Sequence, residues 1–125
     1  MFLQSRQLRG MTAPIVYMSA TASEVYQVGE ALKMSAGAVT KAAAANKPSH
    51  ICVGPAGVNG VPCVEVLPDM EFETTLSAAG TSLAVGNKVT ISADGLQVTA
   101  TTADGVAEIT GMDGTAVGSK VAVKF

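Results

Sequence analysis

The sequence predicts an all-β protein: a small sandwich or barrel of short antiparallel strands with an extended N-terminal arm. Glycine and proline recur roughly every 8–12 residues, and the segments between them are short and rich in Val, Thr and Ile, which is typical of all-β domains. Helical candidates are few. At 125 residues the chain has the length of one domain.

The composition excludes disorder and indicates a thin core. Hydrophobic residues make up 48% of the chain and charged residues 14%, with a mean hydropathy of +0.37. Most of the apolar residues are small, since the chain has 20 Ala and 16 Val but only 3 Phe, 2 Tyr and no Trp. Small side chains bury little area each, so we expect a partner surface to add stability.

The charge distribution argues against nucleic-acid and membrane partners. The net charge is −2, and the two arginines, Arg6 and Arg9, both lie in the first ten residues, so no basic stripe is available for phosphates. No apolar run approaches the roughly 18 residues that cross a bilayer. The first residues also lack the order of a signal peptide, which predicts synthesis in the cytoplasm. We expect residues 1–13 to form a flexible arm and residues 14–125 a single compact β domain.

The first regular element is a Val-Gly turn followed by an alternating strand. The pattern begins at Val28 and recurs at Val85 and Val117. Glycine permits the positive φ of a tight turn, and apolar residues two apart then share the buried face of a strand. The spacing of the first two copies suggests two similar β units, residues 14–67 and 68–125.

Between these copies the sequence predicts a loop and a hairpin. Residues 41–46 are too few for a stable helix and are followed by Lys47-Pro48, so they indicate a loop or a single helical turn. Cys52 and Cys63 flank the Gly-rich segment 54–60 and could face each other across a hairpin. Buried thiols are the favoured interpretation in a cytosolic protein, and a disulfide stays open as the alternative.

The second half is predicted to be a meander. Residues 70–76 alternate between apolar and polar side chains, as in a strand with one buried face. The turns that follow each contain Asp-Gly, a strong hairpin signal. The further expected strands are Lys88–Ser92, Leu96–Thr102, Val106–Thr110 and Lys120–Phe125.

The inventory of reactive side chains is too poor to indicate an enzyme. His50 and Cys52 share a strand face, but no orienting Asn or Asp lies nearby in the sequence, so a core thiol beside an edge imidazole is favoured. Glu71 and Glu73 are better explained by a solvated strand face than by a catalytic carboxylate pair. The carboxylates of the three Asp-Gly turns are expected at separate hairpin tips. We therefore predict no catalytic residues, no metal site and no cofactor.

Most of the chain, from about Thr12 to Phe125, resembles phage capsid decoration or head-fibre proteins. The likeness rests on turn-and-strand motifs along the whole segment. They are Tyr26-Gln27-Val28-Gly29-Glu30-Ala31-Leu32, Thr40-Lys41-Ala42, Lys47-Pro48, Ile51-Cys52-Val53-Gly54, Pro68-Asp69-Met70-Glu71-Phe72-Glu73-Thr74, Gly86-Asn87-Lys88-Val89-Thr90-Ile91 and Gly118-Ser119-Lys120-Val121-Ala122-Val123.

The resemblance implies a structural virion protein that sits on the outside of a phage head, is a homotrimer, and stabilises the shell by bridging subunits of the major capsid protein. Head fibres of this kind carry a distal stalk, and the sequence has no heptad or Gly-X-Y segment, so a decoration cap or the base module alone is implied. The expected contact residues are Arg6, Arg9, Pro14, Pro55, Val58 and Asn59. The alternative is a recognition module of a phage fibre or bacterial surface protein that binds a glycan or a receptor, although aromatic platforms for sugars are scarce.

Overall fold

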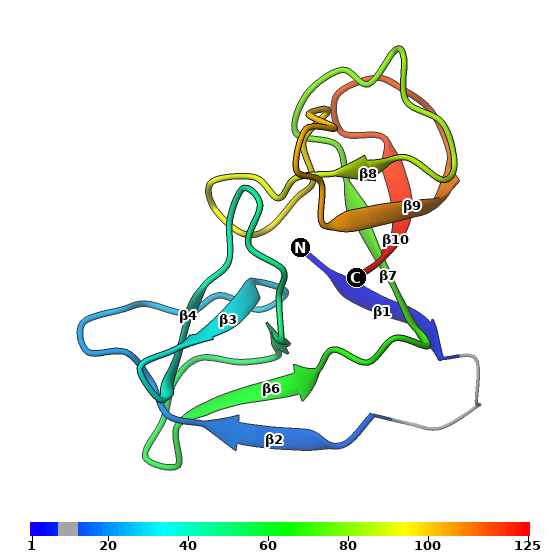
Figure 1. Ribbon diagram of the computed structural model, residues 1–125. Helices are drawn as coiled ribbons and strands as arrows, with labels where there is room; N and C mark the ends of the chain where they lie inside the picture. The colour runs from blue at the N-terminus through cyan, green and yellow to red at the C-terminus, as the bar shows by residue number, and fades with distance from the viewer. Residues whose placement is uncertain (8–12) are drawn as a thin grey trace.

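The protein is a sandwich of two five-stranded antiparallel sheets (Figure 1). The computed structural model describes residues 1–7 and 13–125, and the side chains of all of these except residues 5–7. We call the two sheets the N-terminal sheet and the C-terminal sheet. The N-terminal sheet has the order β2-β6-β5-β3-β4, and its strands are β2 (Ile15–Met18), β3 (Ala31–Ser35), β4 (Ala38–Lys41), β5 (His50–Cys52) and β6 (Val61–Glu65). The C-terminal sheet has the order β1-β7-β10-β9-β8, and its strands are β1 (Leu3–Gln7), β7 (Met70–Thr75), β8 (Lys88–Val89), β9 (Ala107–Met112) and β10 (Lys120–Lys124).

The all-β prediction is confirmed, and the described residues contain no helix of the length and hydropathy needed to cross a membrane. The strands between residues 15 and 65 all lie in the N-terminal sheet, and those between residues 70 and 124 lie in the C-terminal sheet. Strand β1 is the exception, because it comes first in the chain yet joins the edge of the second sheet beside β7.

The main core lies between the sheets. Ala31, Ile51 and Val64 contribute from the N-terminal sheet, and the buried positions of β7, β9 and β10 contribute from the other. Burial along β7 alternates strictly, so the predicted alternating strand over residues 70–76 is confirmed. All three phenylalanines meet here: the Phe125 ring lies 5.5 Å from the Phe2 ring and 5.8 Å from the Phe72 ring, measured between centroids.

A second, smaller core covers the opposite face of the N-terminal sheet. It is built around Leu32, Val39 and the two cysteines, and Tyr26 closes it from the segment between β2 and β3. The Tyr26 hydroxyl donates a hydrogen bond of 2.7 Å to the Val39 carbonyl, which satisfies the polar tip of an otherwise buried ring. The N-terminal sheet therefore contributes to a core on each of its faces.

The three Val-Gly turns have the same backbone geometry. In each turn, the residue after glycine donates a 3.1 Å hydrogen bond to the carbonyl three positions earlier, and the glycine φ is positive, at 79°, 97° and 83°. Each glycine N–H also donates a hydrogen bond to the carbonyl of a partner residue on a neighbouring segment. The N–H of that partner residue donates to the carbonyl of the residue after the glycine. The turns precede β3, β8 and β10, as the repeat predicts. The glycines are Gly29, Gly86 and Gly118, and their partners are Cys52, Ile109 and Leu76.

Substitution of one of these glycines tests the conformational requirement. At Gly118 an added Cβ would meet nothing within 4 Å, so Gly118→Ala leaves only the strain of a left-handed backbone. We expect a loss of about 1–2 kcal/mol in the free energy of unfolding, measured by chemical denaturation. Gly57→Ala is the matched control, because an added Cβ at Gly57 also meets nothing within 4 Å and the φ of Gly57 is not positive. Equal stability of the two variants would contradict the turn assignment.

The described part of the expected N-terminal arm is a strand. Leu3–Gln7 pairs with β7, and the Phe2 side chain is buried in the main core. The physical reason is that β7 has a free edge on that side, and one large aromatic side chain anchors the segment that pairs with it. Strand periodicity is too weak a signal over five residues to reveal this from the sequence.

The expected strand Leu96–Thr102 is wrong. Residues 90–92 and 97–101 exchange three hairpin-like backbone hydrogen bonds, but no continuous strand forms. Val98 forms an isolated antiparallel bridge with Ile91 and, on its other side, an isolated parallel bridge with Leu76, where its N–H donates to the Thr75 carbonyl and its carbonyl accepts from the Ser77 N–H. The predicted strand Lys88–Ser92 is correspondingly shortened to Lys88–Val89. Residues 42–47, between β4 and β5, lie in a loop, as the sequence indicates.

Candidate assembly surface

The His50 imidazole and the Cys52 thiol each make a hydrogen bond to another group. Burial lowers the pKa of His50, and its Nδ1 lies 2.8 Å from the Ser49 hydroxyl. Strand pairing sets His50 opposite Glu65 and Leu32, whereas Cys52 lies opposite Cys63. His50 and Cys52 therefore have different neighbours on the adjacent strands.

The cysteines are packing residues in this structure. Both thiols are free and buried, in register on β5 and β6 as expected for a hairpin. The Cys52 thiol donates to the Gly54 carbonyl at 2.9 Å, and the Cys63 thiol donates to the Val61 carbonyl at 3.3 Å. Desolvation raises the pKa of both, that of Cys63 to about 12, so at neutral pH they remain protonated and weakly nucleophilic.

The carboxylates of the Asp-Gly turns do not converge. Asp94 accepts hydrogen bonds from the Ser92 hydroxyl and the Leu96 N–H, which lower its pKa. Its carboxylate is thus used to hold its own turn. Across residues 1–7 and 13–125, no group of three or more His, Cys, Asp or Glu side chains is placed to hold a metal ion.

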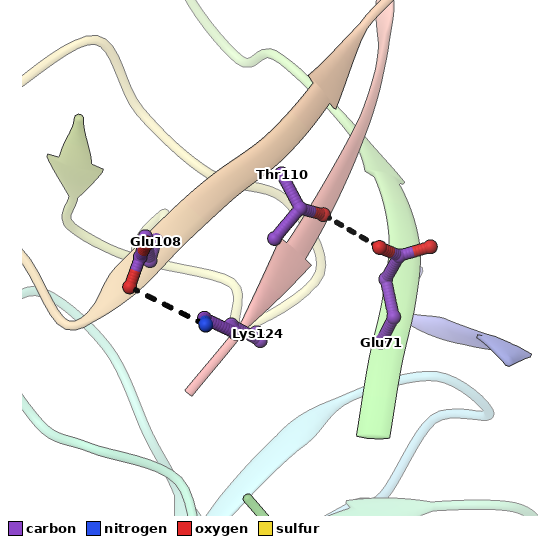
Figure 2. Close-up of polar contacts among 4 residues, drawn as sticks. All are labelled: Glu71, Glu108, Thr110 and Lys124. Carbon is purple, nitrogen blue, oxygen red and sulfur yellow. Dashed lines mark hydrogen bonds and ion pairs between the residues drawn. The ribbon is translucent and has the colours of Figure 1, made fainter. Parts of the chain in front are cut away.

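The outer face of the C-terminal sheet carries a balanced ladder of charges. Glu71 accepts a 2.8 Å hydrogen bond from the Thr110 hydroxyl, and Lys124 lies 3.9 Å from Glu108 (Figure 2). Glu73 pairs with Lys120 at 3.5 Å on the same face. Such half-exposed pairs contribute little stability but keep the face hydrated. Glu71 and Glu73 are therefore neighbours on a solvated face, not an acid and base in a cleft.

One hollow in this region is positively charged. It encloses about 320 Å³ and is lined by the exposed lysines Lys47, Lys88 and Lys124 together with Glu108 and Phe125. Lysines this exposed hold a ligand only weakly.

The four sheet edges differ in how they are protected. Edge strands expose unpaired backbone groups, so proteins cover them, shorten them or give them charges. Strand β4 is covered, because the Val39 N–H donates to the Ser19 carbonyl and the Lys41 N–H donates to the Glu24 carboxylate. Strand β8 is only two residues long and begins at exposed Lys88. Strand β1 is polar in sequence, Leu-Gln-Ser-Arg-Gln.

Among residues 1–7 and 13–125, none gives strand β2 such a protection. It is one of the two outermost strands of the N-terminal sheet, and its four residues, Ile-Val-Tyr-Met, are uncharged (Figure 1). No residue between Arg9 and Glu24 carries a charge. Ile15 and Tyr17 are 58% and 59% exposed, on the sheet face that includes Val64 of the main core. The apolar inner face of the sandwich thus continues uncovered along this edge.

The backbone groups of Ile15 and Tyr17 point outward from the sheet. On β6, the Pro62 carbonyl accepts from the Val53 N–H, so Pro62 faces away from β2 and its neighbours Val61 and Cys63 face toward β2. Their partners in register are Met18 and Val16. By the alternation of an antiparallel ladder, the N–H and C=O groups of the two intervening residues have no partner within the sheet.

The structure gathers some of the expected contact residues around this edge. Pro14 is exposed at the start of β2, and the exposed hairpin tip with Pro55, Val58 and Asn59 reaches its other end, where an added Cβ on Gly60 would lie 2.4 Å from the Met18 carbonyl oxygen. We call Pro14, Ile15, Tyr17, Val58 and Asn59 the β2 edge surface. Arg6 lies in β1 with its backbone opposite Glu71, and Arg9 lies outside the described residues.

Sequence reasoning missed Ile15 and Tyr17, the most exposed large side chains of β2. A signal was present, because a long uncharged run with alternating apolar residues is unusual for an exposed edge. What the sequence lacks is the strand order, and without it an edge strand cannot be told from a central one.

A buried carboxylate lies elsewhere in the N-terminal half. Glu30 is fully buried, with Oε2 accepting a 3.0 Å hydrogen bond from the Gln27 N–H and Oε1 without a hydrogen-bond partner. Desolvation raises the pKa of Glu30, and the charges of Glu24 and Asp94 act in the same direction, while Lys41 opposes them. The carboxylate fixes the first Val-Gly turn at a cost in stability when it is ionised.

Glu30→Gln is expected to raise stability at pH 7. In the parent protein, folding favours the protonated Glu30 carboxyl. The stability that this proton gives the parent is complete below the ordinary glutamate pKa and is lost as the pH rises through the raised folded-state pKa. Glutamine keeps an oxygen for the Gln27 N–H without the charge. We expect the difference in unfolding free energy between the variant and the parent to be largest at pH 7 and to shrink toward pH 4, in denaturation curves recorded across that range.

Glu24→Gln is the contrasting control, because the Glu24 carboxylate accepts hydrogen bonds of 2.6 Å from the Thr40 hydroxyl and 2.7 Å from the Lys41 N–H. Its neutralisation should reduce stability at pH 7. A Glu30→Gln variant that is less stable than the parent at neutral pH would show that the ionised carboxylate is favourable, contrary to this account.

Comparisons with protein-family models, with curated proteins and with solved structures find no match to this chain.

Proposed function

We propose that the protein is a structural component of a phage virion that decorates the outer surface of the head and stabilises the shell by bridging subunits of the major capsid protein. The observation that carries the proposal is the β2 edge surface, an uncharged apolar strand edge with two large exposed side chains. An exposed edge of this kind promotes aggregation unless another protein covers it. A protein that acts in many copies on a lattice covers such surfaces in its working state.

The proposed action is cohesion without catalysis. Each bound copy would add buried area at a junction between capsid subunits, and that area must be exposed again before the shell opens. Several weak identical contacts on one lattice give strong overall attachment. The assembly implied by the family resemblance is a homotrimer, and the proposed location is the outside of the virion head.

Head binding is tested by mixing the purified chain with purified heads that lack it and sedimenting the particles. We expect the chain to pellet with the heads, and cryo-microscopy of the loaded particles to show added protrusions at fixed symmetry positions. A chain that stays in the supernatant while binding to cells or to a glycan array would overturn the proposal in favour of a recognition module.

A further inference from the structure

We infer that β2 pairs with β2 of a second copy of this chain, antiparallel and across a twofold axis, so that the two N-terminal sheets join into one continuous sheet. This inference rests on the proposed function, since it names the partner of the β2 edge surface. It follows from three properties of the edge: its outward backbone groups, the register that those groups allow, and its lack of charge.

The outward backbone groups define which residues can pair. Only Ile15 and Tyr17 of β2 direct N–H and C=O groups away from β6, as shown above. With a twofold axis perpendicular to the sheet, the inner faces of the two copies lie on the same side of the joined sheet. Two residues can therefore lie opposite one another only when their side chains are on the same face. With the axis at Val16, Ile15 of each copy lies opposite Tyr17 of the other. Each such pair can exchange two hydrogen bonds, which gives four across the junction.

A shift of register to an axis at Tyr17 is less favourable. It would set Ile15 opposite Ser19, and the Ser19 carbonyl already accepts a 2.8 Å hydrogen bond from the Val39 N–H. The axis at Val16 instead places the β-branched side chain of Ile15 in each copy beside the Tyr17 ring of the other copy. Aromatic and β-branched residues form favourable cross-strand pairs. Both large exposed side chains of the edge would be covered at once.

Charge also favours a second copy as the partner. The edge has no charged residue from position 10 to position 23, so two copies can approach without repulsion and without burying an unpaired charge. The contact is only four residues long, so its interface is small and the free pair is expected to be weak. A proposed trimer could still use this contact, because a twofold junction would link one trimer to the next.

The self-association is measured on the free chain by analytical ultracentrifugation at concentrations up to about 1 mM, where weak interfaces are detectable. We expect species with an even number of copies to increase with concentration. Ile15→Lys and Tyr17→Lys place a charge on the edge and are expected to weaken this association at least tenfold, while the fold is retained because both side chains are exposed. Val85→Lys is the matched control, an exposed apolar residue before β8.

The register is read by cross-linking. Under oxidising conditions, a mixture of Ile15→Cys and Tyr17→Cys chains should form a disulfide-linked dimer of one variant with the other, and each variant alone should not. The native thiols are buried and do not interfere. A chain that stays monomeric or trimeric at every concentration, an association unaffected by both lysine variants, or cross-linking of either variant with itself would overturn the inference. Because heads are absent, these outcomes are independent of whether the chain binds heads.

Discussion

Phe72→Ala is expected to destabilise the protein by about 3–5 kcal/mol, which is a large share of the total stability of a small domain. Phe72 is fully buried on β7, between β1 and β10, and its ring lies 5.8 Å from that of Phe125. The rest of the core is rich in Ala and Val, so few large side chains can move into the space that the ring leaves. The free energy of unfolding is measured by chemical denaturation.

Glu73→Ala is the matched control for Phe72→Ala. Glu73 is the next residue on the same strand, but its side chain points to the solvated outer face and pairs with Lys120. We expect a loss of less than about 1 kcal/mol from that half-exposed ion pair. Similar losses in the two variants would mean that the alternation of β7 does not determine the core.

Removal of residues 1–10, which leaves a chain beginning at Met11, is the second change with a large expected effect. It deletes β1 and the buried Phe2 side chain, together with the backbone N–H of Phe2, which donates a 2.8 Å hydrogen bond to the Gly29 carbonyl. The loss of one buried phenylalanine alone corresponds to about 3–5 kcal/mol. The truncation also exposes the edge of β7, so we expect concentration-dependent aggregation that light scattering detects.

Leu3→Ala controls for general sensitivity of the N-terminal segment. Leu3 lies on β1 but is half exposed, so its truncation should have a small effect compared with Phe2→Ala. If the chain that begins at Met11 proved as stable as the full chain and equally soluble, residues 1–7 would be a dispensable arm, as the sequence suggests, and β1 would add nothing to the fold.

Patterns confined to a few neighbouring residues were sufficient for many local elements. The alternation of residues 70–76 identifies β7, and the Val-Gly motif identifies three turns with the same hydrogen bonding. The Gly-rich segment 54–60 sets Cys52 opposite Cys63. The alternation and the turn conformations arise within one strand, turn or hairpin, although each Val-Gly turn also bonds to a segment elsewhere in the chain.

Elements that depend on distant partners were not predictable in this way. Residues 96–102 have the composition of a strand, but Val98 makes only isolated bridges, one to Ile91 nearby and one to Leu76 at the end of β7. The N-terminal segment reads as an arm, but it pairs with a strand that begins more than sixty residues later in the chain. Pairing with a distant backbone partner is determined only when the chain is folded.

The same distinction applies to the β2 edge surface. Residue types and contacts between near neighbours specify the all-β class, the local turns and the absence of charge between Arg9 and Glu24. The position of β2 as an outermost strand with Ile15 and Tyr17 uncovered, and the pairing of β1 with the C-terminal sheet, are seen only in the folded molecule. Strand order depends on which distant segments bury each other's apolar faces, so it is a property of the whole chain.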